Sequence, residues 1–437
     1  MCYYMRWVGY GQMIKGKWGQ RYNWQSTRPK ALRITILTQF FPPDFAATGQ
    51  LIEELVSYLA RRDLQFEVIT GMPSYAFSNF KAPRIEFKKN ICIRRTRVGS
   101  LIPRKLRARI ANSLLYTIKM LASLTKSKRR GNLILVTSEP PFLPLIMPIV
   151  SRLFKCPYIV IIYDVYPEVL VRCNILPKDS WLYKLWKLCN RHAYKAAKEV
   201  IVLSSNMKEE ILVNYPDLNS VKVIQTWVDT ELFQKVAVED NWFAKKENLE
   251  DKFVIMYSGN QGRCHDMMSL IKCAEALRHD MSILFMIIGD GAQHEEIKKY
   301  AMERKLKNIR FMRYQEKVDL KYTLSTANLA VVSQKEGFDN LIAPCKIYPH
   351  MSLGTPLLGI TPSTSILREI IETNKIGVWV SNDDIEGLKR SIMTLKENKK
   401  IYTELAQNAR AYVVENHNKD KVMESYYDSI CRNMSLD

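Results

Sequence analysis

The sequence lacks the cysteine and histidine spacings that hold a zinc ion or build a disulfide framework. Its nine cysteines include no CxxC pair, and none of its six histidines lies at a metal-ligand spacing from a cysteine. We therefore expect no metal site, no cofactor and no structural disulfide, and we infer a reducing, cytoplasmic setting.

The chain also lacks a hydrophobic run long enough to cross a bilayer. Its most apolar window, Pro140–Phe154, falls short of the ~20 residues a membrane helix needs and is interrupted by Pro141, Pro144 and Pro148. We expect a buried helix beneath a sheet there. Residues 1–30 contain no apolar core of signal-peptide length, so we treat them as an extension of unknown order.

Acidic residues are missing from one long stretch. The chain carries a net charge of +21, and between Asn90 and Ser138 there are twelve basic residues and no acidic one. Within it, apolar residues recur at helical spacing from Ile102 to Leu121, and the basic residues around them are Arg104, Lys105, Arg107 and Arg109. This pattern suits a helix on an anionic membrane surface. The alternative is a core-facing helix with a solvated basic face. Nucleic acid is disfavoured, because no aromatic residues alternate with the charges.

Strand-like and helix-like segments alternate along most of the chain. At 437 residues it exceeds one ordinary domain. Short apolar runs such as 65–70, 133–137, 158–163, 253–257 and 329–332 predict buried parallel strands, and amphipathic segments between them predict helices. We predict an α/β protein with two Rossmann-like domains, residues 31–225 and 226–415, facing each other across a cleft. A last helix, within residues 416–437, is free to cross back onto the first domain.

Five ordered segments carry a resemblance to a known family: FFPPDFAATGQLIEEL, YDVYPEVL, MYSGNQGRCHD, IIGDGAQ and APCKIYPHMSLGTPLL. They resemble glycosyltransferase family 4, nucleotide-sugar-dependent enzymes of the GT-B fold, and in particular bacterial enzymes that build exopolysaccharide or O-antigen repeat units. The resemblance covers about residues 32–432. It implies that the second domain binds the donor and the first domain the acceptor.

The stretch from Gln334 to Ile360 reads as a strand end, a polar loop and a helix, and such junctions bind ligands in open α/β sheets. Lys346, at the start of the helix, is predicted to hold donor phosphates, with Pro344 and Tyr348 beside it. Glu336 and Asp339 in the loop are the candidates to hold sugar hydroxyls or stabilise the cationic anomeric carbon. An ordinary solvated loop is the alternative.

Two further loops are predicted to contribute to donor binding. In MYSGNQGRCHD, Arg263 is placed to meet the diphosphate and Asn260 to shape the loop. Gly49, after the first strand, would let backbone amides approach a pyrophosphate, although a plain turn glycine gives the same pattern.

The chain departs from the family pattern at one position. Typical members carry a second glutamate eight residues after the first, where it grips the ribose, but Pro344 lies eight residues after Glu336. Alignment on Gly354–Pro356 instead places Pro349 there. No ribose-binding carboxylate is therefore assignable.

In YDVYPEVL, Asp164, Tyr166 and Glu168 follow a buried strand and are expected to face the cleft. Asp164 and Glu168 are candidates to orient the acceptor or act as general base, and Tyr166 belongs to the same side. A structural capping role for Asp164 is the alternative.

The resemblance implies a retaining, metal-independent glycosyltransferase. It would use a UDP- or GDP-type sugar and a lipid-linked or polysaccharide acceptor at the inner face of the plasma membrane. A nucleotide-sugar 2-epimerase of the same fold is an alternative, although it needs more cleft histidines and carboxylates. A non-catalytic membrane-associated scaffold with a decayed site is a third reading, which the missing glutamate keeps open.

Overall fold

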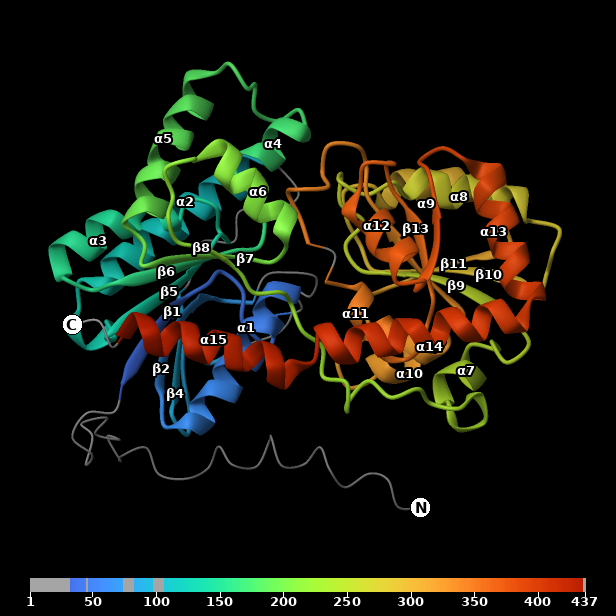
Figure 1. The fold of residues 1–437 in the computed structure, drawn as a ribbon, viewed down its shortest axis with the longest axis horizontal. Helices are drawn as coiled ribbons and strands as arrows, with labels where there is room; N and C mark the ends of the chain where they lie inside the picture. Colours follow the sequence, from blue (N-terminus) through green and yellow to red (C-terminus); the bar gives the residue numbers. More distant parts are fainter. Residues whose placement is uncertain (1–31, 45, 74–81, 97–105, 344, 435–437) are drawn as a thin grey trace.

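The computed structural model describes residues 32–44, 46–73, 82–96, 106–343 and 345–434 (Figure 1). The predicted extension, Arg104, Lys105 and Pro344 lie outside these ranges, as do the side chains of Arg107 and Arg109. Two α/β units are present, each built on one mainly parallel sheet, which confirms the predicted fold class. Among the described helices, none combines the length and apolarity needed to cross a membrane.

The first unit is built on an eight-stranded sheet in the order β3-β4-β2-β1-β5-β6-β7-β8. Its central strands are buried on both faces, as their unbroken apolar runs predict. The strands are β1 (Arg33–Leu37), β2 (Gln65–Gly71), β3 (Ile85–Lys88), β4 (Ile91–Thr96), β5 (Leu133–Thr137), β6 (Tyr158–Ile162), β7 (Glu199–Val202) and β8 (Val221–Val223).

The direction of each crossover decides which face of this sheet a helix covers. The chain steps one way from β1 to β2 and the opposite way from β4 through β5, β6 and β7 to β8. Right-handed crossovers then place α1 on one face and α2 to α6 on the other, as Figure 1 shows. The helices are α1 (Ala47–Leu59), α2 (Leu106–Leu124), α3 (Met147–Phe154), α4 (Glu168–Arg172), α5 (Trp181–Ala196) and α6 (Ser205–Asn214).

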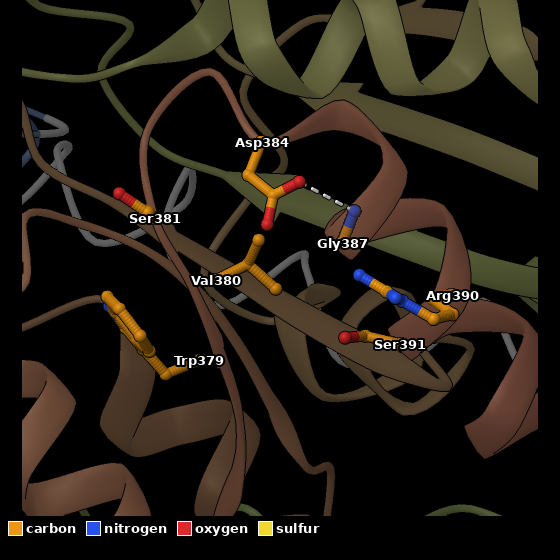
Figure 2. A pocket seen from close by; sticks show the side chains of 7 residues that line it. All are labelled: Trp379, Val380, Ser381, Asp384, Gly387, Arg390 and Ser391. Atoms are coloured by element: carbon orange, nitrogen blue, oxygen red, sulfur yellow. Dashed lines mark hydrogen bonds between the residues drawn. The ribbon is translucent and has the colours of Figure 1, made fainter.

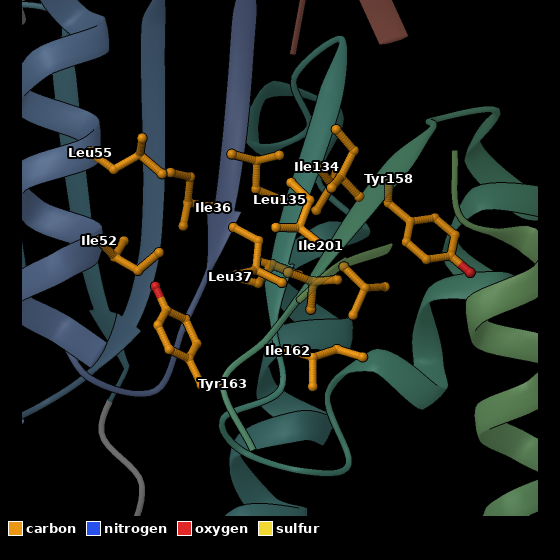
Figure 3. Close-up of a cluster of buried hydrophobic side chains, with 14 of the residues drawn as sticks. Ile36, Leu37, Ile52, Leu55, Ile134, Leu135, Tyr158, Ile162, Tyr163 and Ile201 are labelled. Atoms are coloured by element: carbon orange, nitrogen blue, oxygen red, sulfur yellow. The ribbon is translucent and has the colours of Figure 1, made fainter. Parts of the chain in front are cut away.

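Helix α1 packs against the core of the first unit (Figure 3). Its Ile52 and Leu55 point towards Ile36 and Leu37 of β1, and all four side chains are fully buried. Burial of each such side chain contributes about 1.5–3 kcal/mol. This packing fixes the carboxyl ends of β1, β5 and β6, from which polar residues emerge.

The second unit has a six-stranded, all-parallel sheet in the order β11-β10-β9-β12-β13-β14. The strands are β9 (Phe253–Ser258), β10 (Ile283–Ile288), β11 (Ile309–Met312), β12 (Leu329–Ser333), β13 (Leu357–Ile360) and β14 (Gly377–Val380). The helices are α7 (Trp242–Lys246), α8 (Met267–Ala276), α9 (His294–Glu303), α10 (Leu320–Ser325), α11 (Ile347–Ser352), α12 (Ile366–Thr373), α13 (Ile385–Glu397) and α14 (Lys399–Asn416).

The last helix, α15 (Lys419–Met434), packs against α1 and β5 of the first unit. Between α14 and α15, His417 Nδ1 lies 2.8 Å from the carbonyl oxygen of Thr226, and Asn418 pairs with Val228. The two chain crossings between the units therefore lie side by side and form a hinge.

Two sequence expectations differ from the structure. The antiparallel pair β3–β4 was not expected, because Arg94 and Arg95 interrupt the apolar pattern of β4. Arg95 is nevertheless buried, since its guanidinium lies 2.8 Å from Glu86 and bonds backbone carbonyls. The window 140–154 yields α3 as an amphipathic helix rather than a fully buried one: Met147 and Val150 are buried, but Leu153 is 68% exposed.

Candidate functional site

Three loops of the second unit meet at one edge of its sheet. They leave the carboxyl ends of the neighbouring strands β10, β9 and β12, the edge where open α/β sheets bind ligands. The first two loops pack backbone to backbone: Gly289 has φ +123°, and a Cβ there would lie 2.2 Å from the Gly259 carbonyl oxygen. Only glycine permits this approach.

Lys346 lies at the centre of this edge. Its Nζ is 2.5 Å from Tyr257 Oη and 3.3 Å from His265 Nε2. Tyr257 Oη donates to the carbonyl of Asn260, so it accepts from the ammonium group. Among the described residues, no carboxylate pairs with Lys346. Burial lowers the pKa of Lys346 to about 7.

His265 is held in its neutral form next to this lysine. Its Nδ1 lies 2.7 Å from the Ser333 carbonyl oxygen, which leaves Nε2 as the acceptor facing Lys346. Burial, and then the charge of Lys346, lower the pKa of His265 to about 3. The edge therefore offers one half-buried ammonium group whose partners are all neutral, which is a setting that favours an added anion.

Further cations converge on this edge from both units. Arg263 is exposed. Burial raises the pKa of the Cys173 thiol, directly after α4, and the charge of Arg263 opposes this rise. The charge of Lys335 acts on the same thiol. Arg172 of α4 lies over Gly337, where a Cβ would come within 3.1 Å of its guanidinium. Asn260 is exposed at the tip of its loop.

The loop after β12 reaches across to the first unit. Its Leu341 carbonyl accepts from Val165 N at 3.0 Å, Ile342 pairs with Asp164, and Phe338 is buried in the first unit's core. Glu336 is exposed, whereas Asp339 Oδ1 is buried without a hydrogen-bond partner in the described chain. The predicted donor loop is thus also the contact between the two units.

On the first unit, two carboxylates leave the adjacent strands β5 and β6. Burial and the charge of Glu139 raise the pKa of Asp164 to about 8. Burial also raises the pKa of Glu139, although Thr48 Oγ1 donates to its Oε2 at 2.6 Å and opposes the rise. The pKa of Tyr166 is raised by burial and then by these two charges, so its hydroxyl lies near both. The three groups form a polar cluster facing the second unit.

Three predicted residues lie elsewhere or act through packing. Glu168 faces α5, where its carboxylate is buried 3.3 Å from Lys187 Nζ. Tyr348 stacks on His417 at the hinge, with ring centroids 3.9 Å apart. Gly49 brings the first turn of α1 onto Phe40, since a Cβ would lie 2.9 Å from the Phe40 carbonyl carbon, and this approach places Thr48 beside Glu139.

Sequence reasoning missed Glu139 and undervalued His265. Glu139 directly follows the apolar strand β5, the same signal that selected Asp164 after β6. The position of His265 in the loop before α8 predicts a capping group. In the structure its neighbour Asp266 caps α8 by accepting from Ser269 N at 3.2 Å.

A surface pocket of about 270 Å³ lies two strands further along the sheet, between β14 and α13 (Figure 2). Its Asp384 accepts from Gly387 N and caps α13. None of its lining residues is a candidate named above. In the described part of the chain, no three His, Cys, Asp or Glu side chains are grouped to hold a metal ion.

Two family models match consecutive parts of the chain. Residues 48–232 match "Glycosyltransferase Family 4", and residues 238–412 match "Glycosyl transferases group 1". WbjE of Pseudomonas aeruginosa, named as a glycosyltransferase, is 24% identical and covers 82% of this chain and 88% of its own. WcaI of Escherichia coli K12, named for colanic acid biosynthesis, is 21% identical over 91% of this chain and all of its own.

Solved structures agree on the fold. Sucrose-phosphate synthase from Thermosynechococcus elongatus superposes with a TM-score of 0.73 at 15% identity, covering 93% of this chain and all of that one. HepE from Anabaena, solved with UDP-glucose, gives 0.67 at 14% identity, covering 92% and 100%.

Proposed function

We propose that this chain, a glycosyltransferase by the two family models that match consecutive parts of it, is retaining and metal-independent and uses a nucleotide diphosphate sugar. The observation that carries this proposal is Lys346, a half-buried cation with neutral neighbours at the carboxyl edge of the second sheet. A diphosphate supplies the negative charge that this lysine lacks. HepE was solved with UDP-glucose, which favours a UDP-type donor over a GDP-type one.

Cations on both sides of the cleft support charge stabilisation by the protein itself. When the bond from the anomeric carbon to the diphosphate oxygen breaks, its electron pair leaves with the phosphate. Lys346 and Arg263 can stabilise this charge from the donor unit, and Arg172 of α4 stands opposite them. In this scheme the side chains take over the role a divalent cation plays in other transferases.

Carboxylates near the reacting sugar complete the scheme. The buried, unpartnered oxygen of Asp339 offers an acceptor for a sugar hydroxyl, and the exposed Glu336 has the freedom to reach the same sugar. On the first unit, the pKa values of Asp164 and Glu139 are both raised, so this pair of carboxylates can bind a proton. In this scheme it takes the proton of the acceptor hydroxyl while the hydroxyl oxygen bonds to the anomeric carbon.

We propose a lipid-linked or polysaccharide acceptor at the inner face of the plasma membrane. The name of WcaI places that relative in the synthesis of an exported polysaccharide. On α2, Leu114 and Ile118 are exposed beside Lys119, which supports contact of this helix with an anionic surface.

A nucleotide screen by thermal shift tests the donor assignment. A nucleotide diphosphate that binds only the folded state, at a concentration of about 100 times its dissociation constant, raises the free energy of unfolding by about 2.7 kcal/mol. We expect UDP and UDP-sugars to raise the Tm. Adding a UDP-sugar and a membrane lipid extract should then release free UDP. A 2-epimerase would instead change the sugar while UDP stays attached, and a scaffold would do neither.

A further inference from the structure

Glu54 of α1 is a point at which three parts of the molecule meet. Its Oε1 lies 2.8 Å from Nζ of Lys317, which belongs to the loop after β11 in the second unit. Its Oε2 accepts a hydrogen bond from Nε1 of Trp227 at 2.9 Å. Trp227 lies on the first of the two chain crossings between the units, next to Val228, which pairs with Asn418 of the second crossing. One carboxylate therefore joins α1 to the hinge and to the second unit.

The indole of Trp227 holds this carboxylate in place independently of the ammonium group. Trp227 is buried, and its ring packs edge-on against Tyr426 of α15 with ring centroids 5.7 Å apart. The Glu54 side chain is 20% exposed, against 40% for Lys317. Most surface ion pairs contribute little, because two mobile side chains must both be ordered and solvent screens their charges. Here one partner is already ordered, and Glu53 lies 3.9 Å from the same ammonium group.

The loop that carries Lys317 also packs on the candidate site. Tyr314 Oη, three residues earlier in the chain, donates to the carbonyl oxygen of Asp290 at 3.3 Å. The Tyr314 ring lies close to Gly289, where a Cβ would come within 3.3 Å of it. Gly289 is the residue through which the loops after β10 and β9 are in contact. The position of Lys317 is thus tied to the loops that meet at the Lys346 edge.

Helix α1 connects Glu54 to the carboxylate cluster of the first unit. In the first turn of this helix, Thr48 Oγ1 donates to Glu139 Oε2 at 2.6 Å. Glu54 follows on the same helix, about 9 Å further along its axis. Because a packed helix moves as a rigid element, a displacement of Glu54 displaces Thr48 as well. The ion pair therefore relates the position of the Lys346 edge to that of Glu139 and Asp164.

Two separate contacts fix the angle between the units, whereas a single contact would allow rotation about it. The first is made by the loop after β12, whose Leu341 carbonyl accepts from Val165 N at 3.0 Å. The second is the pair of Lys317 and Glu54, made by the loop after β11. Strands β11 and β12 are three positions apart in the sheet, so the two contacts are separated by roughly 14 Å. This separation lets the ion pair resist a rotation that the loop after β12 alone would permit.

We propose that Glu54 is a positioning residue for sugar transfer: through Lys317 it holds the second unit at the angle at which the Lys346 edge faces the cluster of Glu139 and Asp164. Glu54 takes no part in the chemistry itself. The inference rests on the proposed function for the reaction that it serves, and on the contacts above for the position of the units. Removal of the Glu54 charge should widen the range of angles between the units without altering either half of the site.

Amide hydrogen exchange at Val165 tests the effect on the position of the units. This amide donates to the Leu341 carbonyl across the cleft, so it exchanges when the units separate. In Glu54→Gln, whose side-chain oxygen still accepts from Trp227, we expect exchange at Val165 to be about two- to fivefold faster. Lys317→Met should give the same increase. The double variant should exchange no faster than either single variant, because both substitutions remove the same interaction.

Three controls separate this effect from a general loss of stability. Exchange across β1 should remain at the wild-type rate in every variant. Lys317→Arg keeps the charge and should behave like the wild type. Lys396→Met removes an ion pair inside the second unit, Lys396 with Asp280 at 2.6 Å, and should leave exchange at Val165 unchanged. In the wild type, exchange at Val165 should rise with salt towards the rate of the variants, because salt screens the ion pair.

Release of UDP from UDP-glucose in the presence of a membrane lipid extract gives a second readout. The kcat of Glu54→Gln should fall by about two- to fivefold. The Kd of UDP-glucose, measured without the extract, should stay at the wild-type value, because Lys346 and Arg263 both belong to the second unit. A wild-type rate of exchange at Val165 in both single variants would overturn the proposal. So would a lower kcat with unchanged exchange, since Glu54 would then act only on its immediate surroundings.

The exchange experiment needs no substrate, so it separates this inference from the proposed function. If both single variants exchange faster at Val165 while UDP-sugars neither bind to the wild type nor release UDP, the transferase scheme fails and the role of Glu54 in setting the angle stands. If the wild type transfers sugar and exchange at Val165 is the same in all variants, the proposed function stands and the positioning role of Glu54 fails.

Discussion

Replacing Lys346 by Ala tests the electrostatics of the proposed donor site most directly. The side chain is half-buried, its Nζ contacts Tyr257 and His265, and its pKa is lowered to about 7. In the empty site the ammonium group therefore costs stability. A bound diphosphate should reverse this, because an adjacent anion raises the pKa again.

The magnitude follows from Coulomb's law. A phosphate about 4 Å from the ammonium group gains roughly 4 kcal/mol at an effective dielectric constant of about 20. At pH 7 Lys346 is deprotonated in about half of the empty protein molecules, which weakens the binding free energy by about 0.4 kcal/mol. Arg263 remains to hold part of the charge. A net loss of about 2–3 kcal/mol, or about 30- to 150-fold in affinity, is expected.

Calorimetric titration with UDP-glucose, whose diphosphate has no group that titrates near pH 7, measures this loss at several pH values. Wild-type affinity should be nearly constant below pH 7 and fall by up to about tenfold per unit above it, because binding then requires proton uptake by Lys346. In the variant the affinity should be lower by this factor and the pH dependence above pH 7 should be absent. The Tm of the empty variant should not fall, since a buried charge without a carboxylate partner has been removed.

Lys298→Ala is the matched control, since this exposed lysine of α9 lies outside the site. It should leave the affinity and its pH dependence unchanged. A wild-type affinity that is flat from pH 7 to 9, or a Lys346→Ala variant that keeps the wild-type slope, would refute the reasoning.

Two other substitutions test the acceptor cluster and the loop packing. Glu139→Gln removes a charge that raises the pKa of Asp164, so the acidic limb of the pH–rate profile should move about one unit lower; an unmoved limb would mean that the carboxylates act independently. Gly289→Ala should lower the free energy of urea unfolding by roughly 3 kcal/mol, because its φ is positive and its Cβ meets the Gly259 carbonyl. A Cβ at Gly262 would lie 3.3 Å from the side-chain nitrogen of Asn260, so Gly262→Ala should lower the free energy of unfolding by less. Equal losses for the two variants would contradict the packing argument.

The sequence predicted the parts of the fold that depend on local pattern. Strands such as β9 and β12 are unbroken apolar runs buried on both faces, so their positions and their parallel direction could be inferred without tertiary information. Strand β4 could not, because Arg95 belongs in a strand only when Glu86 and two carbonyls receive its charge. Those partners are supplied by folding.

The sequence predicted only those residues of the candidate site that follow the end of a predicted strand. Lys346 could be placed because it follows a strand and a loop in a recognisable order. The direction of Glu168 towards Lys187 could not be foreseen, because the position of α5 over α4 decides it. The same holds for the interaction of Glu139 with Asp164, which arises from two strands paired in register.

The loop after β12 links donor binding to the relative position of the two units. Phe338 and Leu341 are buried in the first unit, while Lys346, a few residues later, belongs to the proposed donor site of the second. A ligand that fixes Lys346 therefore also restrains a segment whose apolar side chains are packed across the cleft. Because Gly337 has φ +81° beneath Arg172, the loop has little freedom to find another path. The same loop thus joins the proposed donor site to the first unit, where Asp164 is held beside it by its pairing with Ile342.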